Sequence, residues 1–471
     1  MARSVAVGAA AFLMPHARVL GANEDIRLAI VGFNSQGMAH MKSFSKMAGV
    51  RIVALCDCDQ KVIKKGLKFL DEQGLPVPTT TQDLRRILDD RNVDAVTTAT
   101  PNHWHSLFTV WACQAGKDVY VEKPISHEIW EGRKSVEAAR KYQKVVQCGM
   151  HNRSDPGLQE ALEWLKAGNL GKITLARGFC YKRRESIGKS TEPLKIPEGV
   201  DFDLWCGPAP KKAPVRKRLH YDWHWFWDTG NADIGNQGIH EVDQCRWALG
   251  QTGIAPRAMS IGGRFGYEDD AETPNTQIAF IDYKPAPMIF EVRGLPRGKE
   301  GDQKAMDNYK GISIGICIEC EGGYFAGGWA YDKDGKKVRQ FKRDNGASHH
   351  ANFIKALRSR KPADNPADIL EGHLSAGVFH MANISYRLGK ELPAGEVAEK
   401  VKADPQNAEA FERFKAHLAA NGVDVDKAKP VLGPWLDFDA EKERFTGAMA
   451  DEANKYVRRE YRAPFVVPET V

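Results

Sequence analysis

Short apolar runs alternate with amphipathic segments over the first 150 residues of the chain. The runs predict buried strands, and a stretch with helical periodicity follows each one. The predicted strands are Leu28–Val31, Val50–Leu55, Val93–Thr98, Asp118–Val121 and Lys144–Cys148. The predicted helices are Met38–Met47, Lys61–Gln73, Thr81–Asp89, Trp104–Ala115 and Glu128–Tyr142. This alternation predicts an α/β domain with a doubly wound parallel sheet at residues 25–150.

The pattern changes from about Lys172, where strand-like segments follow one another with turns between them. The predicted strands are Ile173–Tyr181, Arg257–Phe265, Thr276–Tyr283, Met288–Arg293, Ile312–Cys320, Gly323–Tyr331 and Lys337–Lys342. The predicted helices are Asp233–Leu249, Ser348–Ser359 and Ile369–Leu388. We therefore expect an α+β domain with a large, mostly antiparallel open sheet at 151–390. Residues 391–471 are polar and helical in pattern, which predicts a C-terminal helical arm on the body or on another subunit.

Length and composition fit two globular domains with an extension. The chain has 471 residues, of which 42% are apolar and 27% charged, as in ordinary globular proteins. Its net charge of +6 is spread over 67 basic and 61 acidic residues without a long basic run, which argues against a nucleic-acid partner. We expect a small-molecule partner, no membrane span and a homo-oligomer.

The cysteines and histidines do not form a recognisable metal motif. Nine cysteines, an odd number, do not make a disulfide framework. Cys56–Cys58 and Cys317–Cys320 lie in strand-like apolar stretches without a second pair at zinc-finger spacing, which favours buried thiols. The histidine pairs His220/His224 and His103/His105 have no carboxylate or cysteine ligand at an adjacent spacing, so we predict no metal.

The first 24 residues resemble a secretory signal. Arg3 precedes the apolar stretch Val5–Met14, which is too short to span a bilayer, and small residues follow at Gly21-Ala22. A disordered tail is the alternative. We expect an exported, periplasmic protein of a bacterial envelope, and otherwise a cytoplasmic one.

A glycine turn follows the first predicted strand, in the run Ile26–Gly37. Gly32 ends the strand, Gly37 opens a helix, and Asn34 stands where the G-x-G-x-x-G fingerprint has its middle glycine. Asn tolerates a positive φ better than most residues, so the turn can keep its conformation with Asn34 in place of glycine. The Asn side chain leaves somewhat less room for a pyrophosphate. Unpaired N–H groups at such a helix start bind anions, although two glycines alone are a weak signal.

Asp57 strengthens the dinucleotide interpretation. It lies 20 residues past Gly37, at the end of the second strand, where a carboxylate can bind the ribose hydroxyls. The next residues, Cys58-Asp59-Gln60, include no arginine for a 2′-phosphate, which favours NAD over NADP. We therefore predict a Rossmann domain that binds NAD.

Two further motifs follow the strands of this predicted sheet, Thr100-Pro101-Asn102-His103 and Glu122-Lys123-Pro124. Ligands of open parallel sheets bind beyond the carboxyl ends of the strands. A lysine at this edge can donate to a substrate oxygen as a hydride leaves the carbon. The predicted cofactor-binding residues are Gly32, Phe33, Asn34, Gln36, Gly37, Asp57, Thr100, Pro101, Asn102, His103, Glu122 and Lys123.

Together these motifs resemble the Gfo/Idh/MocA family, which includes glucose–fructose oxidoreductase and inositol dehydrogenase. The likeness covers roughly Ile26–Leu388 and extends through Trp205-Cys206-Gly207-Pro208-Ala209-Pro210, Gly238-Ile239-His240 with Asp243, and Asn352-Phe353. It implies a Rossmann domain, a C-terminal α/β domain with a large open sheet, a nicotinamide cofactor, and a sugar or cyclitol substrate.

The resemblance also implies catalytic roles. The lysine of the Glu-Lys-Pro motif corresponds to Lys123, and the general acid/base histidine of many members corresponds to His240. Many members carry an Asp four residues before that histidine, but this chain has Asn236, which cannot titrate. On one continuous helix Asn236, His240 and Asp243 would share a face, with Asp233 one turn back. Asp243 and Asp233 are thus the candidate substitutes for the carboxylate.

An aromatic strip, Leu219–Trp227, precedes that predicted helix. Aromatic rings stack on the C–H faces of sugars, so the strip suits a carbohydrate pocket, although packing at a domain or subunit seam explains it equally well. Lys182-Arg183-Arg184 could supply further donors. The predicted substrate-binding residues are Lys123, Tyr181, Arg183, Trp225, Asn236 and His240.

The leading hypothesis is an NAD-dependent oxidoreductase that transfers hydride between nicotinamide and a sugar or polyol. One alternative resembles the NAD-dependent glycoside hydrolases of the same superfamily, which work by transient oxidation and elimination. The other is a sugar-binding or sensing protein without turnover, which only the change to Asn236 favours.

Overall fold

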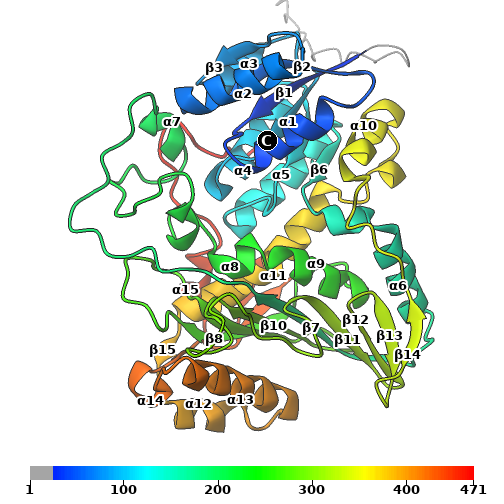
Figure 1. Ribbon diagram of the computed structural model, residues 1–471, viewed down its shortest axis with the longest axis vertical. Coiled ribbons are helices and arrows are strands. Elements are labelled where there is room, and N and C mark those ends of the chain that lie inside the picture. Colours follow the sequence, from blue (N-terminus) through cyan, green and yellow to red (C-terminus); the bar gives the residue numbers. More distant parts are fainter. Residues whose placement is uncertain (1–24) are drawn as a thin grey trace, which may run out of the picture.

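The computed structural model describes residues 25–471, so the predicted signal-like segment lies outside the described residues. The described chain forms a parallel six-stranded sheet and a larger, mostly antiparallel sheet (Figure 1). The predicted fold class is therefore confirmed. None of the helices in this part of the chain is long and apolar enough to cross a membrane.

The first sheet has the strand order β3-β2-β1-β4-β5-β6, and its pairings are all parallel. Chain order reverses between β1 and β4, which is where such sheets bind ligands. Its elements are β1 (Ile26–Val31), α1 (Gln36–Phe44), β2 (Val50–Cys56), α2 (Gln60–Glu72), β3 (Thr79–Thr81), α3 (Leu84–Asp89), β4 (Ala95–Thr98), α4 (Asn102–Gln114), β5 (Asp118–Val121), α5 (Ile129–Lys141) and β6 (Val146–Cys148).

The second sheet runs β14-β13-β12-β11-β7-β10-β9-β8-β16-β15, with β7 and β10 parallel and the other pairs antiparallel. Its main strands are β7 (Ile173–Tyr181), β8 (Arg257–Gly263), β9 (Thr276–Ile281), β10 (Met288–Arg293), β11 (Ile314–Cys320), β12 (Gly323–Ala326), β13 (Trp329–Asp332) and β14 (Lys337–Gln340). The predicted single strand Gly323–Tyr331 is a hairpin, because Gly327 and Gly328 turn the chain with φ of +57° and +82°.

Helices between the two sheets connect the domains (Figure 1). They include α8 (Ala232–Asn236), α9 (Ile239–Ala248) and α11 (Ile369–Arg387), and their buried side chains join one apolar core with α4 and α5 of the first domain. The remaining helices here are η1 (His151–Ser154), α6 (Pro156–Lys166), α7 (Phe202–Cys206), η2 (Asp222–Trp225), α10 (His349–Ser359) and η3 (Pro362–Asp364).

The segment after residue 390 contains strands as well as helices. Its elements are β15 (Lys390–Glu391), α12 (Ala394–Val401), α13 (Pro405–Ala420), α14 (Val425–Ala428), β16 (Val431–Leu432), β17 (Leu436–Asp439), β18 (Arg444–Thr446) and α15 (Ala450–Asn454). Helices α12 and α13 cover the far face of the second sheet (Figure 1), where Phe411 and Phe414 are buried. The prediction of a helical arm did not include β16 and β17, which both pair with β8.

The last residues return to the first domain. The Trp130 N–H donates to the Val457 carbonyl at 3.0 Å, and Phe465 packs edge-on against Trp104 with ring centroids 5.3 Å apart. Phe465 and Val467 are buried in the same core as α4. The C-terminal residues therefore complete the surface of the N-terminal domain.

Candidate active site

A cavity of about 490 Å³ lies between the first sheet and the second domain. Its volume is in the range of ligand sites, about 300–1,000 Å³. It is lined by the predicted residues Gly32, Asn34, Gln36, Asp57, Thr100, Pro101, Asn102, Glu122, Lys123, Asn236 and His240. The predicted residues that do not line it are Phe33, Gly37, His103, Tyr181, Arg183, Trp225 and Asp243.

The glycine turn forms one end of the cavity and fits a dinucleotide. Gly32 has φ +68°, and a Cβ there would lie 2.8 Å from the Thr100 N. A Cβ on Gly37 would lie 2.2 Å from the Gly32 carbonyl oxygen, so this glycine serves the packing of α1 on the turn. Asn34 does not have the positive φ that the sequence argument allowed for. Ser35 makes no side-chain cap to α1, whose N-terminus is thus open to an anion.

Asp57 is held rigidly beside this turn. Its carboxylate accepts hydrogen bonds from the Phe33 N–H and the Asp59 N–H, both at 3.0 Å. Burial raises its pKa, and these two hydrogen bonds oppose that effect. A carboxylate has about four acceptor positions, so Asp57 can still accept from ribose hydroxyls. The turn and Asp57 together fit NAD.

Glu122 organises the opposite wall of the cavity. Its Oε1 contacts His40 Nε2 at 2.9 Å and accepts from Gln36 Nε2 at 3.3 Å, and its Oε2 accepts from the Lys123 N–H at 3.1 Å. Burial would raise the pKa of Glu122, but the His40 hydrogen bond and the Lys123 ammonium hold it well below its usual range. A Cβ at Gly149 would lie 2.7 Å from this carboxylate, which explains the glycine. Sequence reasoning missed both His40 and Gly149.

Lys123 reaches from β5 to the second domain. Its Nζ donates to the Asn236 carbonyl oxygen at 2.6 Å. Burial lowers the pKa of Lys123, and the neighbouring Glu122 partly opposes this. The ammonium is therefore fixed in the cavity wall, where it can donate to a substrate oxygen.

His240 lies close to Lys123 at the start of α9. Burial and then the charge of Lys123 lower the pKa of His240 well below its ordinary value, so the ring is neutral near pH 7 and can accept a proton. Within residues 25–471, its Nδ1 has no hydrogen-bond partner. The ring of His151 lies 4.7 Å from it, centroid to centroid, and also lines the cavity, although the sequence analysis did not single it out.

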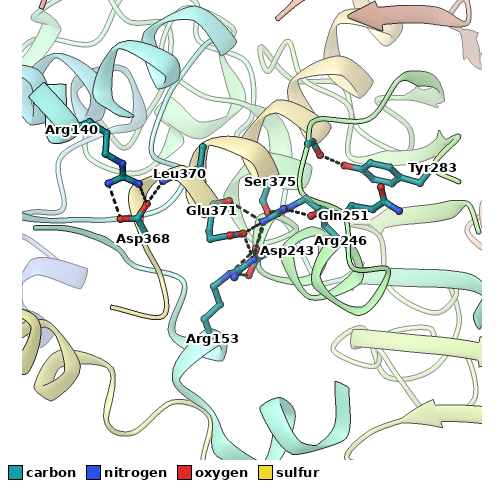
Figure 2. A network of polar contacts seen from close by, with 11 residues as sticks. Arg140, Arg153, Asp243, Arg246, Gln251, Tyr283, Asp368, Leu370, Glu371 and Ser375 are labelled. Carbon is teal, nitrogen blue, oxygen red and sulfur yellow. Dashed lines mark hydrogen bonds and ion pairs between the residues drawn. The ribbon is translucent and has the colours of Figure 1, made fainter. Parts of the chain in front are cut away.

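The predicted helix Asp233–Leu249 is interrupted at Gln237-Gly238, so Asn236 lies on α8 while His240 and Asp243 lie on α9. Asp243 does not line the cavity as Asn236 and His240 do, which corrects the prediction that the three share one functional face. Asp243 instead belongs to a buried network with Arg153, Arg246, Glu371 and Ser375 (Figure 2). Arg153 donates to both of its oxygens, at 2.9 and 2.8 Å. Asp243 thus binds two arginines outside the cavity.

The remaining candidate for the carboxylate, Asp233, lies beside Asn236, which lines the cavity. Asp233 is buried and accepts two hydrogen bonds from Arg184, at 2.8 and 2.7 Å. Asn236 donates to the same carboxylate at 3.3 Å. Asp233 is therefore an ion-pair partner of Arg184, and Asn236 contributes its carbonyl to Lys123.

Tyr181, the last residue of β7, and Arg183, which follows it, were predicted to bind substrate but point away from the cavity. Tyr181 donates to Glu291 at 2.8 Å on the opposite face of the sheet, and Arg183 contacts Tyr267. Neighbouring residues of an extended chain point to opposite faces, so Lys182 and Arg184 line the cavity instead.

The aromatic strip lines the cavity, but through other residues than the predicted Trp225. His220, Tyr221, Trp223 and His224 line the cavity. Trp225 is buried behind them, and the Arg184 guanidinium lies 5.3 Å from its ring. The strip therefore reaches the cavity, while Trp225 supports Arg184 from behind.

A cap, residues 199–223, covers the Asp57 end of the cavity, beside the first sheet in Figure 1, where α7 is labelled. The Asp201 N–H donates to the Cys58 carbonyl at 2.8 Å, and His220 Nε2 lies 3.1 Å from Asp59 Oδ2. Buried His103 holds the cap from below, with Nε2 3.0 Å from the Trp205 carbonyl oxygen. Arg462 of the C-terminal segment binds the Asp203 carboxylate at 2.8 Å.

The structure also bears on metal binding. In residues 25–471, no three His, Cys, Asp or Glu side chains lie where they could hold a metal ion together.

Glu241 beneath the cavity should make stability depend on pH. Burial raises its pKa to about 8, so the folded protein keeps this proton between the ordinary carboxyl pKa and pH 8 while the unfolded chain releases it. The free energy of unfolding should therefore fall as pH rises through this window, and Glu241→Gln should remove about 2–4 kcal/mol of that fall. Denaturant titration of the wild type and of Glu241→Gln at pH 5 and pH 8 measures this change in the free energy of unfolding.

The exposed Glu72→Gln is the matched control and should keep the wild-type dependence. An unchanged pH dependence in Glu241→Gln would contradict the assignment.

Comparison with known proteins identifies both domains. The profile of an oxidoreductase family with an NAD-binding Rossmann fold, GFO_IDH_MocA, matches residues 26–150. The profile of the C-terminal alpha/beta domain of that oxidoreductase family matches residues 161–291.

Curated relatives are similar over a shorter stretch. A "Glycosyl hydrolase family 109 protein" of Shewanella pealeana is 29% identical over 156 residues, 32% of this chain and 34% of that protein. An "Alpha-N-acetylgalactosaminidase" of Shewanella oneidensis is 28% identical over 156 residues, with the same shares. The chain thus spans about a third of the length of the curated relatives it matches.

Solved structures share the fold. The WlbA dehydrogenase from Bordetella pertussis, in complex with NADH and UDP-GlcNAcA, superposes with a TM-score of 0.54 at 18% identity. The superposition covers 76% of this chain and 97% of that one. At this identity the likeness concerns the fold alone.

Proposed function

This chain belongs to the Gfo/Idh/MocA family of NAD-binding oxidoreductases, and we propose that it transfers hydride between NAD and a CH–OH carbon of a sugar or polyol. The observation that carries this proposal is the meeting of the glycine turn, Lys123 and His240 in one cavity. Bound NAD would supply the hydride acceptor or donor.

The chain's own residues provide the accompanying proton chemistry. The Lys123 ammonium would donate to the substrate oxygen and stabilise its developing negative charge. The neutral His240 imidazole would accept the hydroxyl proton during oxidation and return it during reduction. Glu122 orients Lys123 by accepting from its backbone N–H, and Asn236 holds the ammonium through its carbonyl.

A glycoside hydrolase is the second candidate, and the cap is the observation that favours it. A cofactor held under residues 199–223 would leave slowly, which suits chemistry that ends with the cofactor in its starting state. In that chemistry a ring hydroxyl is oxidised transiently, the neighbouring C–H is deprotonated, the glycosidic bond is eliminated, water adds, and the oxidation is reversed. The names of the Shewanella relatives agree with this candidate.

Export is part of the same proposal. It rests on the sequence of residues 1–24, with Arg3 and the short apolar stretch Val5–Met14. A retained cofactor would allow turnover where no free NAD is supplied.

Purification without added cofactor tests both candidates, because the cap should keep NAD bound through gel filtration. The NAD-loaded protein is then given free sugars and aryl glycosides, with absorbance of NADH and of the released aryl group as readouts. Net NADH formation from a free sugar is the result expected for the oxidoreductase. Release of the aryl group without net NADH would support the glycosidase, and sugar binding with neither signal would overturn both.

A further inference from the structure

Two lysine side chains from different domains meet at the break between α8 and α9. The Lys123 Nζ donates to the Asn236 carbonyl oxygen at 2.6 Å, and the Lys182 Nζ donates to the Gln237 side-chain oxygen at 2.8 Å. Both lysines line the cavity. Their acceptors are neutral, so both ammonium charges remain available to a ligand.

The other charges around this point offset those of the two lysines only in part. Within residues 25–471, neither Lys123 nor Lys182 forms an ion pair with a carboxylate. Asp233 is bound to Arg184 through both oxygens, and Glu122, the one carboxylate described above as acting on Lys123, also contacts His40. Glu241 is uncharged near pH 7, because burial raises its pKa to about 8. The substrate end of the cavity therefore carries excess positive charge.

A bound ligand would remove water from both ammonium groups. Burying a cation without a counter-charge is costly, and an anionic ligand would compensate for the lost hydration. The first turn of the ten-residue helix α9 adds to this preference, since the N-terminus of a helix carries partial positive charge. A neutral sugar would leave the charge of Lys182 uncompensated.

We propose that the substrate carries an anionic substituent, a carboxylate or a phosphate, and that Lys182 binds it beside Gln237 while Lys123 contacts the reacting oxygen. The substrate class is then an acidic or phosphorylated sugar. This inference rests on the proposed function only for the sugar itself. Lys182 is a specificity residue and takes no part in hydride transfer.

Binding of matched probes to the NAD-loaded protein tests the charge preference. The probes are D-glucuronate, D-galacturonate, D-glucose 6-phosphate and D-galactose 6-phosphate, with D-glucose and D-galactose as their uncharged partners, measured by calorimetry. At least one charged probe should bind about tenfold or more tightly than its partner, and added salt should shrink the difference. Comparison of the uronates with the phosphates identifies the anion.

Variants of Lys182 show whether this side chain is responsible. Lys182→Met should weaken binding of the preferred charged probe about tenfold or more, whereas the uncharged partner should change less than about twofold. Lys182→Arg should restore most of the preference. The exposed Lys217→Met, in the cap and outside the cavity lining, is the control and should behave as wild type.

Two results would overturn the inference: equal binding of charged and uncharged probes, or no binding of any charged probe. Failure of the proposed function is a separate result. In that case charged probes would bind in a manner that depends on Lys182, but neither NADH nor an aryl group would appear. Turnover of neutral sugars without a charge preference would leave the proposed function standing and remove this inference.

Discussion

Lys123→Ala should reduce turnover by about a hundredfold to a thousandfold while NAD still binds, because removing one donor to a developing oxyanion costs about 10²–10³ in rate. The Lys123 Nζ reaches the Asn236 carbonyl across the cavity, so its loss removes the cation from the reacting oxygen. The turn around Gly32 and the Asp57 carboxylate are untouched. Single-turnover rates with bound NAD, together with calorimetry of NAD binding, measure the two effects separately.

The exposed Lys61→Ala, at the start of α2, is the matched control and should keep wild-type rates. Normal turnover in Lys123→Ala would remove the role proposed for this lysine. Loss of NAD binding together with turnover would instead indicate a structural defect in the cofactor site.

Asp243→Ala should destabilise the protein by about 3–5 kcal/mol, because removing one partner of a buried ion pair leaves uncompensated charge in the interior. Asp243 is 1% exposed and accepts hydrogen bonds from Arg153 and Ser375, with Arg246 3.7 Å away (Figure 2). In this variant Glu371 would still form ion pairs with both Arg153 and Arg246. The shift of the unfolding midpoint measures the effect, and turnover per folded molecule should stay within about threefold of wild type.

Asp282→Ala provides the comparison, since its ion pair with Lys284 lies at the surface, where such pairs contribute about 0–1 kcal/mol. A stable Asp243→Ala variant that has lost turnover would contradict the structural role and return Asp243 to the catalytic candidates.

Much of the fold could be predicted from sequence because buried parallel strands are continuous apolar runs. Asp118–Val121, Ile173–Tyr181 and Met288–Arg293 have the predicted bounds. The interruption of the helix at Gln237-Gly238 was not predicted. A Cβ on Gly238 would lie 2.7 Å from the Ile234 carbonyl oxygen, and a second close contact comes from a residue distant in sequence. A Cβ there would lie 2.8 Å from Phe290 Cε1 on β10, a contact that no local pattern reveals.

The candidate site, like the fold, could be predicted where it depends on local sequence and not where it depends on packing between distant segments. The motifs around Gly32, Asp57 and Lys123 lie directly after strands, so their meeting at one edge follows from the topology. Lys182 and Arg184 line the cavity in place of Arg183, because side chains alternate between two faces in the extended segment after β7 and only packing decides which face meets the cavity. His40 and His151 contribute through contacts between elements far apart in sequence.

The return of the C-terminal residues to the first domain affects how the chain can fold during synthesis. Trp104 and Trp111 on α4 emerge from the ribosome long before Phe465, which packs against both rings. Until then the nascent N-terminal domain exposes aromatic surface, and such surface favours aggregation. The NAD-binding domain therefore completes this part of its packing only after Phe465 has been synthesised.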